Sequence, residues 1–267
     1  AATMAGATAA ALASSGAPAE TAELSKVQLL EQRISADIKR AQEELESYTK
    51  NDGSFRRKDT VEVVKDVMKR IKEAASELNR QSEEVRERLY YLIYNSTILI
   101  FRACHQLRVA NFSREATHYL AFNVLCLDNN LILTTTKYLD WRVLNYVELA
   151  RAYADVGALK AANKVISYGI SKVLYTKQIE EQDPPVPEGT KDTLIDALRV
   201  LRTQELKYEL QSGALQPEAW RKKLEETFAN NKYHRSLAIV ECLQTNEPFT
   251  TSVKGKGGSK AGKIIAG

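Results

Sequence analysis

Histidine and cysteine are the side chains of this sequence best suited to bind a metal ion. The chain contains three histidines, His105, His118 and His234, and no two of them lie at the spacing typical of metal ligands. His105 directly follows Cys104, but consecutive side chains of a helix point about 100° apart and do not converge on one ion. We therefore expect no metal site and no cofactor.

The cysteines are the other candidates for chemistry, either as nucleophiles or as a disulfide framework. Cys104, Cys126 and Cys242 are far apart, odd in number and embedded in apolar helical patterns, as buried free thiols of a reducing compartment are. The sequence contains no nucleophile elbow, no GxxxxGK[ST] phosphate loop and no GxGxxG turn after a strand. The prediction is that the protein is not an enzyme. The alternative is a catalytic cluster assembled from distant residues, which no local motif would reveal.

Composition and charge narrow the class of protein further. The chain has 267 residues, of which 44% are hydrophobic and 27% charged, which is enough apolar material for a sizeable core. No run of eighteen apolar residues exists, so we expect no membrane span. The formal net charge of +4 is matched by four lysines near the C-terminus, so the rest of the chain is near neutral and predicts no nucleic-acid surface.

The first third of the chain predicts an alanine-rich disordered tail, residues 1–22, followed by a coiled-coil-like amphipathic helical hairpin, residues 23–89. Apolar residues recur every three to four positions from Leu24 to Tyr48. A second helix is expected to begin near Asp59 and to continue past Leu99, because its apolar residues follow a heptad spacing. Its partner is either the first helix, favoured by the short turn between them, or another chain.

The strongest structural pattern runs from residue 146 to residue 169. Large and small residues alternate at helical spacing on both sides of a turn at Gly157, which is typical of the two packed helices of a tetratricopeptide repeat. The alternative is a generic pair of antiparallel helices, because the proline that usually ends such a repeat is absent. A second hairpin around Asn111 is weakly similar at an offset of 46 residues, longer than the usual 34. We assign residues 90–181 to a tetratricopeptide-like α-solenoid array within an all-α fold.

The remaining segments are a loop, further helices and a basic tail. Residues 182–190 contain three of the six prolines and predict an extended connector, with a polyproline ligand as the less favoured interpretation. Residues 191–246 predict C-terminal helices, and residues 247–267 a disordered basic tail. The tail solubilises the chain or contacts an acidic surface such as a tubulin tail. The candidate basic contact residues are Lys254, Lys256, Lys260 and Lys263.

Six residues of the array are candidates for the core or for an interface. Tryptophan and arginine dominate binding hot spots, which suggests a partner contact at Trp141 and Arg142. Because Trp141 lies among other large apolar residues, a core role is favoured for it. The full set is Tyr138, Trp141, Arg142, Tyr146, Tyr153 and Ala162.

Three segments between Tyr94 and about Val156 resemble the cilia- and flagella-associated protein 54 family. They are YNSTILIFRACHQL, EATHYLAFNVLCLDNN and KYLDWRVLNYVELARAY. The most specific motif consists of Tyr138, Leu139, Trp141 and Arg142. The resemblance implies a structural helical scaffold in a projection on a central-pair microtubule of the axoneme, needed for ciliary beating, within a large complex of other central-apparatus proteins. It supplies no catalytic residues, and family members are many times longer than this chain.

Two other functions are compatible with the residues alone. A cytoplasmic peptide-binding adaptor of the tetratricopeptide type would line an exposed groove with polar residues such as Asn123, Asn145 and Lys164. A microtubule-binding or nucleic-acid-binding protein would instead act through the basic residues near the C-terminus.

Overall fold

The computed structural model describes residues 17–51, 58–182, 188–214, 216–229 and 231–244. Within these residues the secondary structure consists of α-helices and two short 3-10 helices, with no strand. The all-α prediction is therefore confirmed. The helices are α1 (Ala17–Asn51), α2 (Lys58–Asn79), α3 (Glu83–Arg88), α4 (Tyr90–Val109), α5 (Ser113–Asp128), η1 (Ile132–Thr134), η2 (Thr136–Tyr138), α6 (Leu139–Asp155), α7 (Leu159–Gln182), α8 (Thr190–Gln211), α9 (Pro217–Thr227) and α10 (Lys232–Gln244).

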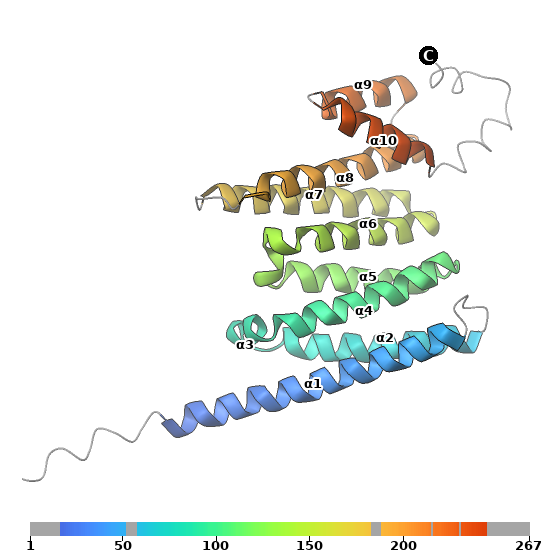
Figure 1. Cartoon of the computed structure of the whole chain (residues 1–267). Coiled ribbons are helices and arrows are strands. Elements are labelled where there is room, and N and C mark those ends of the chain that lie inside the picture. Colours follow the sequence, from blue (N-terminus) through green and yellow to red (C-terminus); the bar gives the residue numbers. More distant parts are fainter. Residues whose placement is uncertain (1–16, 52–57, 183–187, 215, 230, 245–267) are drawn as a thin grey trace, which may run out of the picture.

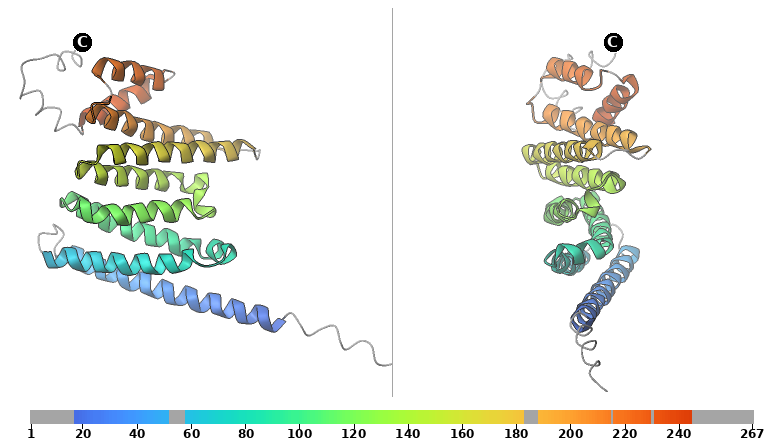
Figure 2. Two further views of the ribbon diagram at one scale, coloured as in Figure 1. Left: turned by 180° about the vertical axis from the view of Figure 1, so that it is seen from behind. Right: turned by 90° about the vertical axis from the view of Figure 1, so that its left-hand side faces the viewer.

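The helices form an elongated stack, with α1 at one end and α9 and α10 at the other (Figure 1). The same order of layers is seen from behind in Figure 2. The main helices pack against their neighbours in sequence, and α1, α4, α6, α8 and α10 also contact one another in that order. We call these five helices the α1–α10 row. The tetratricopeptide type of the array stays a prediction.

One continuous apolar core connects α1 to α8, and a smaller core lies beneath α9 and α10. Fully buried side chains such as Ile34, Met68, Ile93 and Leu107 fill the N-terminal half of the larger core. Each large apolar side chain contributes about 1.5 to 3 kcal/mol on burial, so the stacking of neighbours holds the helices together. None of the helices in the described residues is both long and apolar enough to cross a lipid bilayer.

The N-terminal hairpin forms within the chain, as the short turn predicts. Helix α1 packs against α2, and the two helices are also joined by exposed ion pairs of Arg33 with Glu77 and of Arg70 with Glu44. Helix α1 begins at Ala17, so the prediction of a disordered tail is wrong for residues 17–22. Residues 1–16 lie outside the described part.

The expected single helix from Asp59 past Leu99 is wrong, because it is broken into α2, α3 and α4. The break lies at Ser82, which occupies the N-cap position of α3 with φ −58° and ψ 159°. Glu83 and Glu84 follow in the first turn, where the helix dipole favours acidic side chains. Leu78 of α2 and Leu89, which lies between α3 and α4, are both buried, so the apolar series reaches the core on both sides of the break.

Three further helix starts differ from what the local sequence predicts. The apolar spacing predicts a helix from Ile132, but the helix begins only at Leu139, since the Thr134 and Thr135 hydroxyls donate to carbonyls three residues earlier and hold 3-10 turns. The hydroxyls of Ser113 and Thr190 predict N-caps, but these residues are the first residues of α5 and α8. At Thr190 the N-cap is Gly189, whose φ of 82° suits a glycine. Pro217, a residue that favours the first turn of a helix, begins α9.

The predicted loop 182–190 is described only at its ends: Gln182 ends α7 and Thr190 begins α8. Within the predicted segment 191–246, the structure forms α8, α9 and α10. Residues 247–267 lie outside the described part, so their prediction as a tail stays a prediction.

Candidate functional site

The six residues singled out in the sequence lie close together in the stack. Tyr138 ends η2, four of the others lie on α6, and Ala162 lies on α7. Arg142, Tyr146 and Ala162 are buried, whereas Tyr138, Trp141 and Tyr153 are partly exposed. The set therefore divides into an internal half and a half that reaches the surface.

The internal half is organised around a buried carboxylate. Asp128, the last residue of α5, accepts a hydrogen bond of 2.6 Å from the Tyr146 hydroxyl and pairs with Arg142 at 3.2 Å. Arg142, only 2% exposed, also donates to the Thr134 carbonyl oxygen at 3.0 Å and to the Thr176 hydroxyl at 3.3 Å. One guanidinium thus connects α5, η1, α6 and α7. Burial first, and then the charge of Asp128, raise the pKa of Tyr146, so its hydroxyl remains a donor.

Tyr146 also determines how closely α6 and α7 approach. A Cβ atom on Gly169 of α7 would lie 3.0 Å from two carbons of the Tyr146 ring. The glycine is therefore required by a close helix contact, and Ala162 is fully buried in the same interface. The alternation of large and small residues in the sequence predicted this close approach.

Two residues of the exposed half, Tyr138 and Trp141, belong to a line of aromatic side chains in the seam between α4 and α6. Tyr138 lies 5.2 Å from Tyr94, and Trp141 lies 4.9 Å from Phe101, measured between ring centroids. His105 stacks on Phe101 at 6.2 Å with the ring planes 3° apart. All its members are partly exposed. We call this set the aromatic strip: Tyr90, Tyr94, Phe101, His105, Tyr138 and Trp141.

Trp141 is anchored within the aromatic strip by a hydrogen bond. Its indole Nε1 donates to the Thr97 hydroxyl at 3.0 Å, and Thr97 donates to the Tyr94 carbonyl oxygen at 2.7 Å. The anchoring fixes the ring while leaving part of it at the surface. The choice between a core role and a partner contact for Trp141 stays a prediction.

Shallow grooves follow the α1–α10 row on both sides of the aromatic strip. One of about 320 Å³ lies between α1 and α4, where Ile38, Tyr91 and Ile98 line it. Another of about 380 Å³ is lined by residues of α6, α8 and α10. Grooves along one row of helices are suited to extended polypeptide segments.

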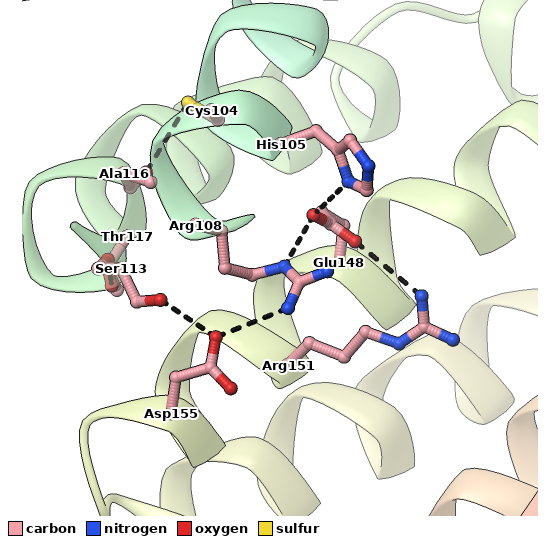
Figure 3. A network of polar contacts seen from close by, with 9 residues as sticks. All are labelled: Cys104, His105, Arg108, Ser113, Ala116, Thr117, Glu148, Arg151 and Asp155. Atoms are coloured by element: carbon pink, nitrogen blue, oxygen red, sulfur yellow. Dashed lines mark hydrogen bonds and ion pairs between the residues drawn. The ribbon is translucent and has the colours of Figure 1, made fainter. Parts of the chain in front are cut away.

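A second buried carboxylate, Glu148 of α6, ties α6 to α4 (Figure 3). Its side chain is 1% exposed and lies 2.7 Å from Arg108 Nε and 2.8 Å from His105 Nδ1. Arg151 approaches the other carboxylate oxygen at 3.7 Å. Arg108 also contacts Asp155 at 3.3 Å, so it lies between the two carboxylates.

The ionisation of Glu148 follows from this network. Burial alone would raise the pKa of Glu148, but the hydrogen bonds and charges of Arg108 and His105 outweigh it and lower that pKa below its ordinary value. The carboxylate is therefore charged at neutral pH, with Arg108 and Arg151 as its cations and His105 as a further partner. Its role is structural, since general base chemistry needs a pKa nearer to neutral.

The chemistry available to the cysteines is limited by their burial. Cys104, Cys126 and Cys242 are buried thiols, as predicted, and none of them forms a disulfide in the described part of the chain. Burial raises the pKa of Cys126 to about 12 and that of Cys242 to about 11, and it holds the pKa of Cys104 well above its ordinary value. Thiols in this state are protonated at neutral pH and are poor nucleophiles. In the described part of the chain, no group of three or more His, Cys, Asp and Glu side chains could hold a metal ion.

Two structural carboxylates were missed from the sequence. Glu148 and Asp128 each pair with a cation on another helix or turn, and Glu148 is separated from Arg108 by 40 residues. The available signal for Glu148 was an acidic residue between apolar neighbours in YVELARAY.

The polar residues expected to line an adaptor groove do not do so. Asn123 and Asn145 are buried, with Asn123 Nδ2 donating to Asn145 Oδ1 at 3.2 Å, and Lys164 is exposed on α7, outside the α1–α10 row. That expectation is wrong because both amides lie in the core, where Asn123 also donates to the Thr97 carbonyl oxygen and Asn145 donates to the Trp141 carbonyl oxygen. The four candidate lysines, Lys254 to Lys263, lie outside the described residues.

Comparison with known proteins gives a consistent result. The family model described as Cilia- and flagella-associated protein 54 matches residues 34–194, from α1 to α8. The Chlamydomonas reinhardtii protein of that name is 25% identical over 165 residues, which are 61% of this chain and 5% of that protein. The human protein is 28% identical over 94 residues, 35% of this chain and 3% of its own length, and the mouse protein 29% over 69 residues, 26% and 2%.

The chain thus spans only a small part of these relatives. The matched region contains α2 to α7 entirely, including both buried carboxylates and the aromatic strip. Because the family model covers more than half of the sequence, this chain belongs to the cilia- and flagella-associated protein 54 family.

Proposed function

We propose that the chain is a non-enzymatic structural scaffold of the ciliary or flagellar axoneme, in a projection of the central apparatus. Its family membership and the names of its relatives support an association with cilia and flagella. The chain acts through contacts with other axonemal proteins in a large complex. Tubulin is a further candidate partner.

The observation that carries this proposal is the aromatic strip. Aromatic side chains are enriched in protein interfaces and dominate their hot spots. A ring that is already held rigid also loses little conformational entropy on binding. Here five of the rings are tyrosine, tryptophan or phenylalanine, all partly exposed in one seam between α4 and α6. An interface of this kind needs a surface held in a fixed shape before the partner arrives.

The buried ion pairs provide that fixed shape. Glu148 with Arg108 holds α6 on α4, and Asp128 with Arg142 holds α5 and η1 on α6. Both ion pairs adjoin the aromatic strip. Arg142 directly follows Trp141 in the sequence of α6, and Glu148 lies 2.8 Å from His105 of the strip. A rigid strip on a helical stack is a binding surface, and the protonated thiols provide no competing chemistry.

The location is tested by tagging the chain in cells with motile cilia. We expect the tagged chain to cofractionate with central-pair projections and to be lost from axonemes that lack the central pair. Recovery in the soluble matrix, or with outer doublets only, would refute the proposal.

The partner surface is tested by truncating exposed rings of the aromatic strip. Tyr94→Ala combined with Tyr138→Ala is expected to abolish incorporation into the axoneme while the purified chain stays folded. The matched control is Tyr175→Ala, which removes a 61% exposed tyrosine from α7. Equal incorporation of both variants would exclude the aromatic strip as the contact.

A further inference from the structure

The groove between α6, α8 and α10 differs from the aromatic strip in chemistry. It has a volume of about 380 Å³, near the lower end of the roughly 300 to 1,000 Å³ typical of ligand pockets, so it holds a few side chains. Its apolar lining is aliphatic rather than aromatic: Val143, Leu144, Val147, Ala197 and Val200. Aliphatic walls of this kind suit the methylene stems of long charged side chains.

The charges of the groove favour a cationic ligand. Asp140, Asp196 and Glu241 line it together with a single cation, Arg151, which gives the lining residues a net charge of −2. Arg199 pairs with Asp196 at 3.5 Å and with Glu241 at 3.3 Å and offsets part of this charge. Asp140 is exposed and has no ion pair within the described residues.

A buried amide in the groove also lacks a donor. Gln204 is 4% exposed and lines the groove, and its Oε1 has no hydrogen-bond partner in the described part of the chain. Leaving a buried acceptor without a donor costs about 1 to 3 kcal/mol. This oxygen has almost no accessible surface of its own, so a lysine ammonium, which carries three donors and no acceptor, meets the carboxylates of the groove and not this amide.

We propose that the groove is occupied by the chain's own basic segment, residues 254–263. This segment contains four lysines and no acidic residue. It follows α10, whose last residue, Gln244, is three positions beyond Glu241 of the groove. Charge and position in the chain therefore both point to the same occupant.

The chain between the end of α10 and the basic segment is long enough for the lysines to reach the groove. Lys254 lies ten positions after Gln244, and an extended chain spans roughly 3.3 Å per residue, or roughly 33 Å. On α6 the groove extends from Asp140 to Arg151, about 16 Å at 1.5 Å per residue. A short tether gives an effective concentration in the mM range, so even an affinity of about 1 mM keeps the groove substantially occupied.

The contact has a functional consequence that does not depend on the proposed axonemal role. The same four lysines are the candidates for binding an acidic partner such as a tubulin tail. While they occupy the groove they are withheld from that partner, so the groove and the partner compete.

The test is zero-length cross-linking of carboxylates to amines in the full chain, followed by mass spectrometry. A mixture of ¹⁴N-labelled and ¹⁵N-labelled chains distinguishes contacts within one chain from contacts between copies. We expect Lys254 to Lys263 to couple to Asp140 and Asp196 within one chain, several-fold more than to the exposed controls Glu43 on α1 and Glu225 on α9.

A charge reversal gives a second readout. Asp140→Lys is expected to reduce coupling at Asp196 and Glu241 several-fold, whereas the matched control Glu43→Lys leaves it unchanged. The proposal is overturned if coupling is spread evenly over exposed carboxylates, if it is found only between copies, or if Asp140→Lys has no effect. None of these results bears on whether the chain is located in the axoneme.

Discussion

Gly169→Ala is the most direct test of the close contact between α6 and α7. In a helix interior, alanine is more favourable than glycine by about 1 kcal/mol, so the substitution would stabilise an unconstrained helix. At this position the added Cβ would lie 3.0 Å from the Tyr146 ring and 3.4 Å from Leu201 Cδ1. Inserting a methyl group into a well-packed core costs about 1 to 3 kcal/mol.

Whether Gly169→Ala stabilises or destabilises the chain depends on whether the Tyr146 ring can move aside. Its ring is 1% exposed, and its hydroxyl is bonded at 2.6 Å to Asp128, which is itself held by Arg142. Moving the ring would break this hydrogen bond inside the core. We therefore expect the steric cost to exceed the gain in propensity, leaving Gly169→Ala less stable by about 1 kcal/mol.

The assay is chemical denaturation followed by circular dichroism, with Ser171→Ala on the exposed face of α7 as control. In a Tyr146→Leu background the contact is absent, and Gly169→Ala is then expected to stabilise the chain by about 1 kcal/mol. A reversal of sign between the two backgrounds identifies the ring as the cause. If Gly169→Ala stabilised the original chain by the full propensity gain, the packing described here would be refuted.

Three further substitutions test the aromatic strip and the two buried carboxylates. Trp141→Ala is expected to lower the free energy of unfolding by about 2 to 3 kcal/mol, below the roughly 3 to 5 kcal/mol of a fully buried tryptophan, because its ring is partly exposed. An unchanged melting temperature with lost partner binding would instead make it an interface residue. Arg142→Met is expected to cost about 3 to 5 kcal/mol, since it leaves Asp128 buried without its cation, and a loss below about 1 kcal/mol in urea denaturation would contradict that burial. Because the pKa of Glu148 is lowered in the folded chain, the unfolded chain binds a proton at Glu148 more readily. The stability that the charged Glu148 side chain contributes is therefore present above the ordinary pKa of about 4.3 and is lost as the pH falls through the lower folded pKa. Glu148→Gln is expected to reduce stability at neutral pH and to flatten its decline in acid, and an unchanged acid limb would contradict this assignment.

The sequence was informative where one residue type has a clear local meaning. Gly157 and Pro217 mark helix boundaries because of their backbone geometry, and the structure has them at φ 80° and in the first turn of α9. Small residues opposite large ones predicted the approach of Gly169 to Tyr146. Such features depend on neighbours within one or two helices, which a sequence pattern contains.

The sequence was misleading where two local preferences compete. The heptad spacing favoured a continuous helix through Ser82, but two glutamates follow it, and acidic residues favour the first turn of a new helix even though the Ser82 side chain makes no capping hydrogen bond. In the same way, the apolar spacing of α6 continues backwards through three consecutive threonines, but the hydroxyls of Thr134 and Thr135 bond to carbonyls three residues earlier and hold 3-10 turns. Periodicity alone does not determine which preference prevails.

The ion pairs could not be predicted because their partners are far apart in the sequence. They nevertheless select one packing register of the helices, which apolar packing alone does not do. Amphipathic helices of similar composition can pack against each other in several registers with comparable burial. A buried carboxylate without its cation is strongly unfavourable, so Glu148 with Arg108, and Asp128 with Arg142, penalise every register that separates them. We infer that these pairs fix α4, α5 and α6 in the one arrangement that lines up Tyr94, Tyr138 and Trp141 along a single seam.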